Sequence, residues 1–151
     1  MSSKRALTVG LLAFALIFAI DQYIKTLFVE GFRWYSDYID LILVYNHGVA
    51  FGSFAFLAEN LKYIQIALLV GVVVYVIKTR ATLYAGPVGI LLGAGSSNIF
   101  DRFIHGGVVD YIFYHHWFDF AVFNFADVMI DVAIVWILLL NYLSTRKNER
   151  I

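Results

Sequence analysis

Four acidic residues next to apolar stretches are the part of this sequence most able to do chemistry. They are Asp21, Asp101, Asp110 and Asp127. Two carboxylates held close together do not both ionise easily, so they share one proton. One of the two can then act as a base toward water while the other acts as an acid toward a carbonyl group. That is the arrangement used by aspartic peptidases.

Most of the acidic residues also have an ordinary structural explanation. Asp21 and Lys25 have the i, i+4 spacing of a helix ion pair, so they serve either that role or a substrate-facing one. Asp101 beside Arg102 fits a salt bridge at a helix end, or a pair that braces a site. Asp131 would need a partner, a proton or solvent at its position in an apolar run, and we expect a structural or solvated role for it.

Asp110 and Asp127 differ in how well a structural role explains them. Asn124 and Asp127 have the spacing of a helix capping box, so capping is the structural alternative for that pair. Asp110 has the weakest structural explanation, because an acid between Val-Val and Tyr-Ile gains nothing from burial without a partner.

The overall composition indicates a membrane protein. Of the 151 residues, 62% are hydrophobic and 15% are charged, and the mean hydropathy is strongly positive. A soluble domain of this size could not bury so much apolar surface, because its surface-to-volume ratio is too high. The formal net charge of zero provides no basic face for nucleic acid. The absence of cysteine excludes disulfides, thiolate catalysis and cysteine metal sites.

Four apolar segments predict an all-α membrane fold with four transmembrane helices, forming a single domain over residues 1–151. The expected spans are residues 6–24, 61–78, 83–100 and 126–142. The first is interpreted as an uncleaved span, since no small-residue cleavage site follows it. The second is shorter than the roughly 20 residues that a core of about 30 Å needs, but its flanking lysines can snorkel. The third contains Gly89-x-x-x-Gly93, a helix-packing pattern to which we assign no function.

Basic residues predict the orientation of these spans. They gather before the first span, between the second and third, and after the fourth: Lys4, Arg5, Lys78, Arg80, Arg146, Lys147 and Arg150. By the positive-inside rule this side is cytoplasmic, so both termini are cytoplasmic and the acidic residues lie near the outer face. The outer segments hold a strand-like run at residues 38–45, a turn at residues 46–48 and an aromatic-rich stretch at residues 111–125. Both segments are predicted to lie against the membrane surface.

Other kinds of site and protein fit the sequence less well. The adjacent His115 and His116 diverge on a helix or strand, and no His-Glu-x-x-His pattern is present, so a zinc site is not expected. A serine peptidase would need Ser96 or Ser97 with a membrane-embedded histidine, which the sequence lacks. A proton-carrying transporter would need an ionisable residue near mid-membrane, and Asp131 lies close to one end of its span. A non-catalytic assembly protein would use the aspartates only as structural ion pairs.

Five motifs in order resemble the bacterial lipoprotein signal peptidases, also called signal peptidase II. They are Asp21-Gln22-x-x-Lys25, Asn46-x-Gly48-x-Ala50-Phe51, Asn98-x-x-Asp101-Arg102, Val108-Val109-Asp110-Tyr111 and Phe123-Asn124-x-Ala126-Asp127. Each motif alone is weak, but the ordered set is specific and covers nearly the whole chain. Two positions depart from the family pattern. Ser97 stands where the family usually has glycine, and Asp131 stands where a small or uncharged residue is expected.

The resemblance implies an aspartic endopeptidase of the bacterial cytoplasmic (inner) membrane. Such enzymes remove the signal peptide of a prolipoprotein by cutting before its diacylglyceryl-modified cysteine. The family match makes Asp110 and Asp127 the catalytic pair, and helix-dipole reasoning favours Asp110 as the partner that carries the proton. The matched positions that bind substrate or support the site are Asp21, Lys25, Asn46, Gly48, Asn98, Asp101, Arg102 and Asn124.

The resemblance also implies what surrounds this site. It predicts no metal and no organic cofactor, and it predicts inhibition by the cyclic peptide globomycin. A small extracytoplasmic β-rich cradle with a surface helix is expected between the first two spans, with the active site near the outer face. The protein is expected to be a monomer that contacts membrane lipids.

Overall fold

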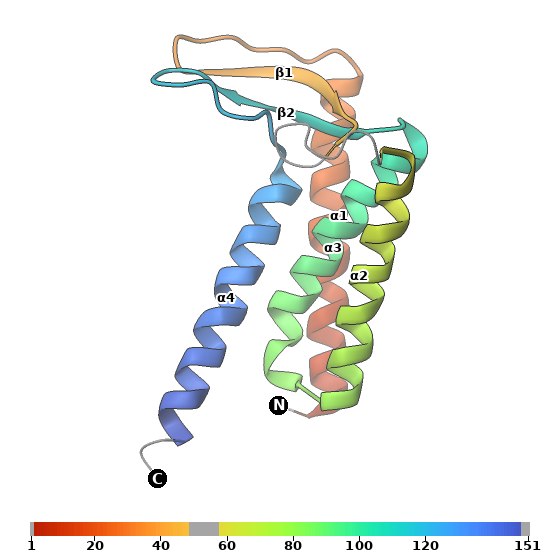
Figure 1. Ribbon diagram of the computed structural model, residues 1–151, viewed down its shortest axis with the longest axis vertical. Coiled ribbons are helices and arrows are strands. Elements are labelled where there is room, and N and C mark those ends of the chain that lie inside the picture. Colours follow the sequence, from red (N-terminus) through yellow and green to blue (C-terminus); the bar gives the residue numbers. More distant parts are fainter. Residues whose placement is uncertain (1, 49–57, 149–151) are drawn as a thin grey trace.

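The computed structural model describes residues 2–48 and 58–148. Long helices run side by side, and a small sheet lies across one end of them (Figure 1). The elements in chain order are α1 (Ser3–Val29), β1 (Ile39–Asn46), α2 (Ala58–Thr79), the short 3-10 helix η3 (Thr82–Tyr84), α3 (Ala85–Ile104), β2 (Val108–Tyr114) and α4 (Phe125–Asn148). The start of α1 and the end of α4 both lie at the end away from the sheet (Figure 1).

Three of the described helices are long and apolar enough to cross a membrane. These segments are Ser3–Val29, Asn60–Thr79 and Phe125–Arg146, within α1, α2 and α4. They contain the predicted first, second and fourth spans entirely and extend beyond both ends of each. The second span is therefore longer than the sequence suggested. The 22 residues of α2 give a helix of about 33 Å, enough for a hydrocarbon core of about 30 Å.

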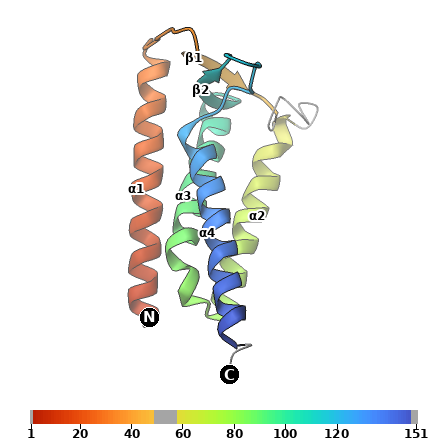
Figure 2. The ribbon, with the colours of Figure 1, turned by 90° about the vertical axis from the view of Figure 1, so that its left-hand side faces the viewer.

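Helix α3 is the packing centre of the bundle and is not among the three membrane-length apolar helices of the described residues. It contacts α1, α2 and α4, and it lies between α1 and α2 (Figure 2). A Cβ atom at Gly93 would lie 2.6 Å from the carbonyl oxygen of Phe14, and one at Gly89 would collide with the backbone of Gly10. The Gly89-x-x-x-Gly93 pattern thus allows α1 and α3 to approach closely. On the surface of α3 that faces α1, small residues therefore stand where a lipid-facing helix would carry large apolar ones.

The small sheet pairs β1 with β2 in antiparallel orientation. Val44 lies opposite Asp110, and the register shifts between Leu41 and Val44. The strand predicted at residues 38–45 is confirmed with a shift of one residue. The second strand was not predicted, because the sequence assigned most of its residues to an aromatic surface segment. An isolated bridge between Ile112 and Phe123 then brings the chain back toward the start of α4.

The predicted β-rich cradle between the first two spans is not confirmed in that form. The sheet takes its second strand from the segment between α3 and α4, so it is not built from the segment between the first two spans alone. Residues 30–48 contain β1 and turns but no helix. The remaining positions for the predicted surface helix, residues 49–57, lie outside the described residues, so that helix stays a prediction.

Candidate active site

The beginning of α4 positions Asp127. The Asn124 Oδ1 atom accepts the backbone N–H of Asp127 at 2.9 Å, and the Asp127 Oδ2 atom accepts the backbone N–H of Asn124 at 3.1 Å. This reciprocal pair is the capping box that the spacing of the two residues predicted. The capping role and a catalytic role are compatible, because the second carboxylate oxygen, Oδ1, faces Asn98 instead.

Two other elements hold the first turn of α4 in place. The Tyr111 hydroxyl oxygen accepts the backbone N–H of Phe125 at 3.0 Å, and Asp21 Oδ1 accepts that of Ala126 at 2.9 Å. The Tyr111 ring stacks on Phe28 of α1 with ring centroids 4.3 Å apart. The first backbone N–H groups of a helix have no partner within it, and here side chains from β2 and α1 supply those partners. The direction in which Asp127 points is therefore set by three elements.

Strand β2 positions Asp110. Its carboxylate is 2% exposed and accepts one hydrogen bond at each oxygen. Asn46 Nδ2 donates to Oδ2 at 2.9 Å from the end of β1, and Asn124 Nδ2 donates to Oδ1 at 2.7 Å from the cap of α4. These amide donors explain how an acid among apolar neighbours is tolerated: it has partners.

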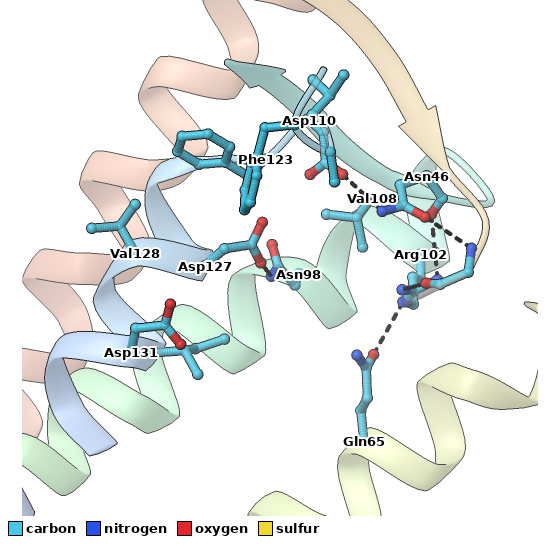
Figure 3. Close-up of a pocket in the computed structure, with 15 residues that line it drawn as sticks. Asn46, Gln65, Asn98, Arg102, Val108, Asp110, Phe123, Asp127, Val128 and Asp131 are labelled. Carbon is cyan, nitrogen blue, oxygen red and sulfur yellow. Dashed lines mark hydrogen bonds between the residues drawn. The ribbon is translucent and has the colours of Figure 1, made fainter. Parts of the chain in front are cut away.

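Two asparagines connect Asp110 with Asp127. Asn98 Nδ2 donates to Asp127 Oδ1 at 2.9 Å, and Asn98 Oδ1 accepts a hydrogen bond from Asn124 Nδ2 at 3.2 Å. Both carboxylates line one cavity of about 420 Å³ beneath the sheet. Figure 3 shows Asp110 entering it from β2 and Asp127 from α4. A cavity of this volume has room for a water and a substrate carbonyl beside the two carboxylates.

A buried ion cluster lies behind this cavity. Lys25 is 2% exposed, and its Nζ lies 2.7 Å from Asp21 Oδ2, 2.7 Å from Asp101 Oδ2 and 2.7 Å from Asn98 Oδ1. An ammonium group has three N–H donors, so this set satisfies all of them. The i, i+4 ion pair of Asp21 and Lys25 that the sequence suggested is present, and it is part of a larger cluster.

The two aspartates of this cluster hold the backbone next to the candidate catalytic residues. Asp21 accepts the N–H of Ala126, which precedes Asp127, and Asp101 Oδ2 accepts the N–H of Val109 at 3.0 Å, which precedes Asp110. One lysine thus links the supports of both carboxylates. The suggested salt bridge between Asp101 and its neighbour Arg102 is wrong, because Asp101 pairs with Lys25 of α1 instead.

Arg102 makes a different set of contacts, at the edge of the cavity. Its Nε donates to Gln65 Oε1 of α2 at 3.1 Å, and its terminal nitrogens donate to the backbone carbonyl oxygens of Asn46 and Gly48. Figure 3 shows these contacts on the side of the cavity opposite α4. Arg102 therefore holds the end of β1, with the Asn46 that contacts Asp110, and the residues that follow it.

Burial changes the acid–base properties of two side chains of β2, Asp110 and Tyr111. Removal from solvent raises the pKa of Asp110 to about 7, and the nearby Asp127 charge raises it further, while hydrogen bonds from Asn46 and Asn124 work against the rise. Burial also raises the pKa of the Tyr111 hydroxyl, which stays protonated. Asp110 can therefore hold a proton near neutral pH, as a general acid must.

Asp131 lies one turn further along α4 and lines the same cavity. Within residues 2–48 and 58–148 no hydrogen bond or ion pair reaches its exposed carboxylate. Of the structural and solvated roles expected for Asp131, no contact with the described residues supports the structural one. Figure 3 shows its side chain in the open region below Asp127.

Several supporting residues were not identified as such from the sequence. Gln22 Nε2 donates to Asp101 Oδ1 and Ser97 Oγ, both at 2.8 Å, and Ser97 Oγ donates to Asp21 Oδ2 at 2.6 Å. Gln22 follows Asp21 within a quoted motif, which was the available signal. Ser97 was noted as a departure from the family pattern and as an unsuitable serine nucleophile, not as a supporting residue. Tyr111 follows Asp110 within another quoted motif, whereas Gln65 had no signal in the sequence.

The fully buried hydroxyl of Ser97 gives the first testable prediction. We expect Ser97→Ala to lower the free energy of unfolding by about 1–3 kcal/mol, because a buried carboxylate loses a donor and Gln22 loses an acceptor. A denaturant titration of the detergent-solubilised protein would measure it. Ser96→Ala is the matched control on the same helix. Equal stability of the two variants would contradict the role assigned to Ser97.

Comparison with known proteins identifies the family of this chain. Residues 13–143 match the family described as signal peptidase (SPase) II. The lipoprotein signal peptidase of Sulfurimonas denitrificans is 64% identical over 91% of this chain and 90% of its own, and that of Helicobacter pylori strain 26695 is 47% identical over 99% and 97%. A solved structure described as a bacterial membrane enzyme has the same fold, with a TM-score of 0.79 and 21% identity over 92% of this chain and 90% of its own. On the family match and these relatives, the chain belongs to the signal peptidase II family.

Proposed function

We propose that Asp110 and Asp127 are the catalytic pair with which this membrane peptidase removes signal peptides from prolipoproteins. Membership of the signal peptidase II family makes the chain a prolipoprotein-processing peptidase. The observation that carries the residue assignment is the shared cavity. Two carboxylates from different elements line it, and the amides of Asn98 and Asn124 connect them.

The chemistry follows from one proton shared by this pair. The ionised carboxylate, which we assign to Asp127 at the positive end of α4, takes a proton from water as the water attacks the scissile carbonyl. Protonated Asp110 gives its proton to the carbonyl oxygen, which yields a tetrahedral intermediate. Collapse of that intermediate breaks the C–N bond, and the leaving amine takes the proton that Asp127 had accepted. The hydroxyl proton then returns to Asp110.

The remaining site residues support this pair in our assignment. Asp21, Lys25 and Asp101 hold the backbone on either side of the cavity, and Asn98 and Asn124 orient the two carboxylates. A second group, Asn46, Gly48 and Arg102, forms the rim where a peptide would enter.

The membrane arrangement is part of the proposal. We assign α3 as a fourth span, since its 20 residues reach about 30 Å and three neighbouring helices cover its small-residue surface. The basic residues favour a cytoplasmic location for both termini, in the inner membrane, with the cavity near the outer face. A signal helix could then enter from the lipid and present the bond before its diacylglyceryl-modified cysteine. We expect the monomer to be sufficient, since both carboxylates come from one chain.

A cleavage assay tests the proposed function directly. We expect the purified full-length chain to cut a lipidated prolipoprotein before its modified cysteine, and globomycin to block the reaction. The same precursor without its diacylglyceryl group is the control and should be cut poorly. Lack of cleavage of the lipidated precursor under conditions that keep the protein folded would refute the proposal.

The orientation can be tested separately. Reporter fusions after residue 114 should report the extracytoplasmic side, and fusions after residue 146 should report the cytoplasm. A cytoplasmic location for the segment that contains Asp110 would overturn the assigned topology.

The raised pKa of Asp110 predicts the alkaline side of the pH profile. Because Asp110 loses its proton as the pH rises through about 7, we expect kcat/KM to fall above that pH. The hydrogen bond from Asn46 favours the ionised form of Asp110. Asn46→Ala should therefore move the alkaline limb of the pH profile, where kcat/KM falls, to higher pH by up to about one unit. Asn141→Ala, at an exposed position on α4, is the control. A limb that stays in place or moves to lower pH in Asn46→Ala would contradict this role of Asp110.

The same pKa shift has a consequence for stability. The folded protein binds this proton more tightly than the unfolded chain does, so the contribution of Asp110 is most favourable at low pH. It should decline as the pH rises from about 4 toward 7.

A further inference from the structure

A second cavity lies at the end of the bundle away from the sheet. Its volume is about 530 Å³, and it shares no lining residue with the cavity of Asp110 and Asp127. Residues 3–14 of α1 form one wall, residues 73–77 of α2 form the other, and residues 85–92 of α3 form the floor. Figure 2 shows the corresponding arrangement, with α3 between α1 and α2. We call this cavity the α1–α2 groove.

The dimensions of the groove suit one hydrocarbon chain. Residues 3–14 of a helix rise about 16 Å, which is roughly half of a hydrocarbon core of about 30 Å, or one leaflet. The length of the groove therefore matches an acyl chain that extends through one leaflet.

The lining is apolar along its length and basic at its open end. Leu7 and Leu11 of α1 and Val73 of α2 contribute apolar surface, while Arg80 lies at the turn where α2 ends. Three further cations belong to the adjoining helix ends: Lys4 and Arg5 in the first turn of α1, and Lys78 in the last turn of α2. The sequence has no acidic residue in residues 1–20 or 60–100, so no carboxylate from these segments offsets the positive charge.

We infer that the α1–α2 groove is a binding site for a phospholipid with an anionic headgroup. One acyl chain lies along the groove, and the headgroup phosphate lies beside Arg80. Basic pockets between transmembrane helices recognise anionic lipid headgroups, and each lysine or arginine near the surface contributes about 1 kcal/mol to that attraction. This site is separate from peptide cleavage and does not depend on the assignment of Asp110 and Asp127.

Lipid titration of the delipidated, detergent-solubilised full chain tests the headgroup preference. We expect dioleoyl phosphatidylglycerol to raise the Tm saturably, and dioleoyl phosphatidylcholine, which has the same acyl chains, to raise it much less. Arg80→Gln should increase the half-saturating concentration of phosphatidylglycerol about fivefold. Equal effects of the two lipids on the unaltered protein would overturn the proposal. So would an unchanged half-saturating concentration in Arg80→Gln.

A substitution that fills the groove tests where the acyl chain of the lipid binds. Val73→Phe places a ring in the groove, whereas Val74→Phe adds the same ring at a neighbouring exposed position that does not line it. We expect Val73→Phe to lose the Tm increase caused by phosphatidylglycerol and Val74→Phe to keep it. Size-exclusion chromatography and cleavage activity serve as controls for the folding of both variants. Identical titrations of the two variants would refute the site. A dimer that Val73→Phe dissociates would assign the groove to a second copy and also refute it.

Discussion

Replacing Asp127 with asparagine is expected to lower the rate of prolipoprotein cleavage by at least about a thousandfold. Asparagine has nearly the same shape as aspartate but cannot act as the base toward water. Its oxygen can still accept the backbone N–H of Asn124, so the capping box and the start of α4 are retained. Its amide would face the Nδ2 donor of Asn98, which costs one hydrogen bond. We expect the same loss of activity for Asp110→Asn, since the two carboxylates act as a unit.

The matched control for these variants is Asp131→Asn. It makes the same chemical change in the same cavity at a carboxylate with no hydrogen-bond partner among the described residues. We expect it to keep most of the cleavage activity. Single-turnover cleavage rates, with Tm measured alongside, separate lost chemistry from lost fold. Substantial activity in Asp110→Asn or Asp127→Asn would refute the catalytic pair, and complete loss in Asp131→Asn would show that this third acid takes part.

Lys25→Met is expected to have the second largest effect, this time on stability. Methionine keeps much of the length of the side chain but leaves Asp21 and Asp101, which are 0% and 1% exposed, without their cation. Removing one partner of a buried ion pair costs about 3–5 kcal/mol, because the remaining charge is buried and unpaired. The two aspartates also hold the backbone next to Asp110 and Asp127, so we expect cleavage to fall as well.

Two comparisons make this second experiment specific. Lys62→Met removes a lysine that lies over the rings of Tyr63 and Phe103, a contact worth only about 0.5–1 kcal/mol, and it should change the Tm little. Asp21→Asn combined with Lys25→Met removes one of the uncompensated charges and should recover part of the Tm lost in Lys25→Met. If Lys25→Met unfolds at the same temperature as Lys62→Met, the buried cation does not hold the cluster together.

The requirement for this cluster follows from where the site lies. Asp110 and Asp127 come from a strand and from the helix that follows it after a connecting segment, and neither element alone sets the distance between them. Lys25 on α1 pairs with both Asp21 and Asp101. Asp21 holds the start of α4, and Asp101 holds β2. A change in α1 can therefore alter the catalytic geometry without touching the substrate.

Local spacing was enough to predict part of this site. The membrane-spanning character follows from composition, since long apolar runs have no other solvent than lipid. The ion pair of Asp21 and Lys25 and the capping box of Asn124 and Asp127 were also predicted, because each joins residues three or four positions apart. The strand near residues 38–45 was predicted from its β-branched and aromatic composition. The assignment of Asp110 and Asp127 came from the ordered motifs of a family, which the spacing of two acids alone would not have supplied.

The tertiary structure decided the contacts between residues far apart in the chain. Asp101 lies beside Arg102 in the sequence, yet it pairs with Lys25 because α1 packs closely against α3 at glycines. Asp110 meets Asn46 because β2 pairs with β1, and we recognised no strand signal in the residues of β2. The periodicity and spacing of a single sequence determine hydrogen bonds within one or two turns. Which acids share a cavity depends on how the helices pack and how the two strands pair, and in this protein these tertiary contacts bring the five separate segments of the site together.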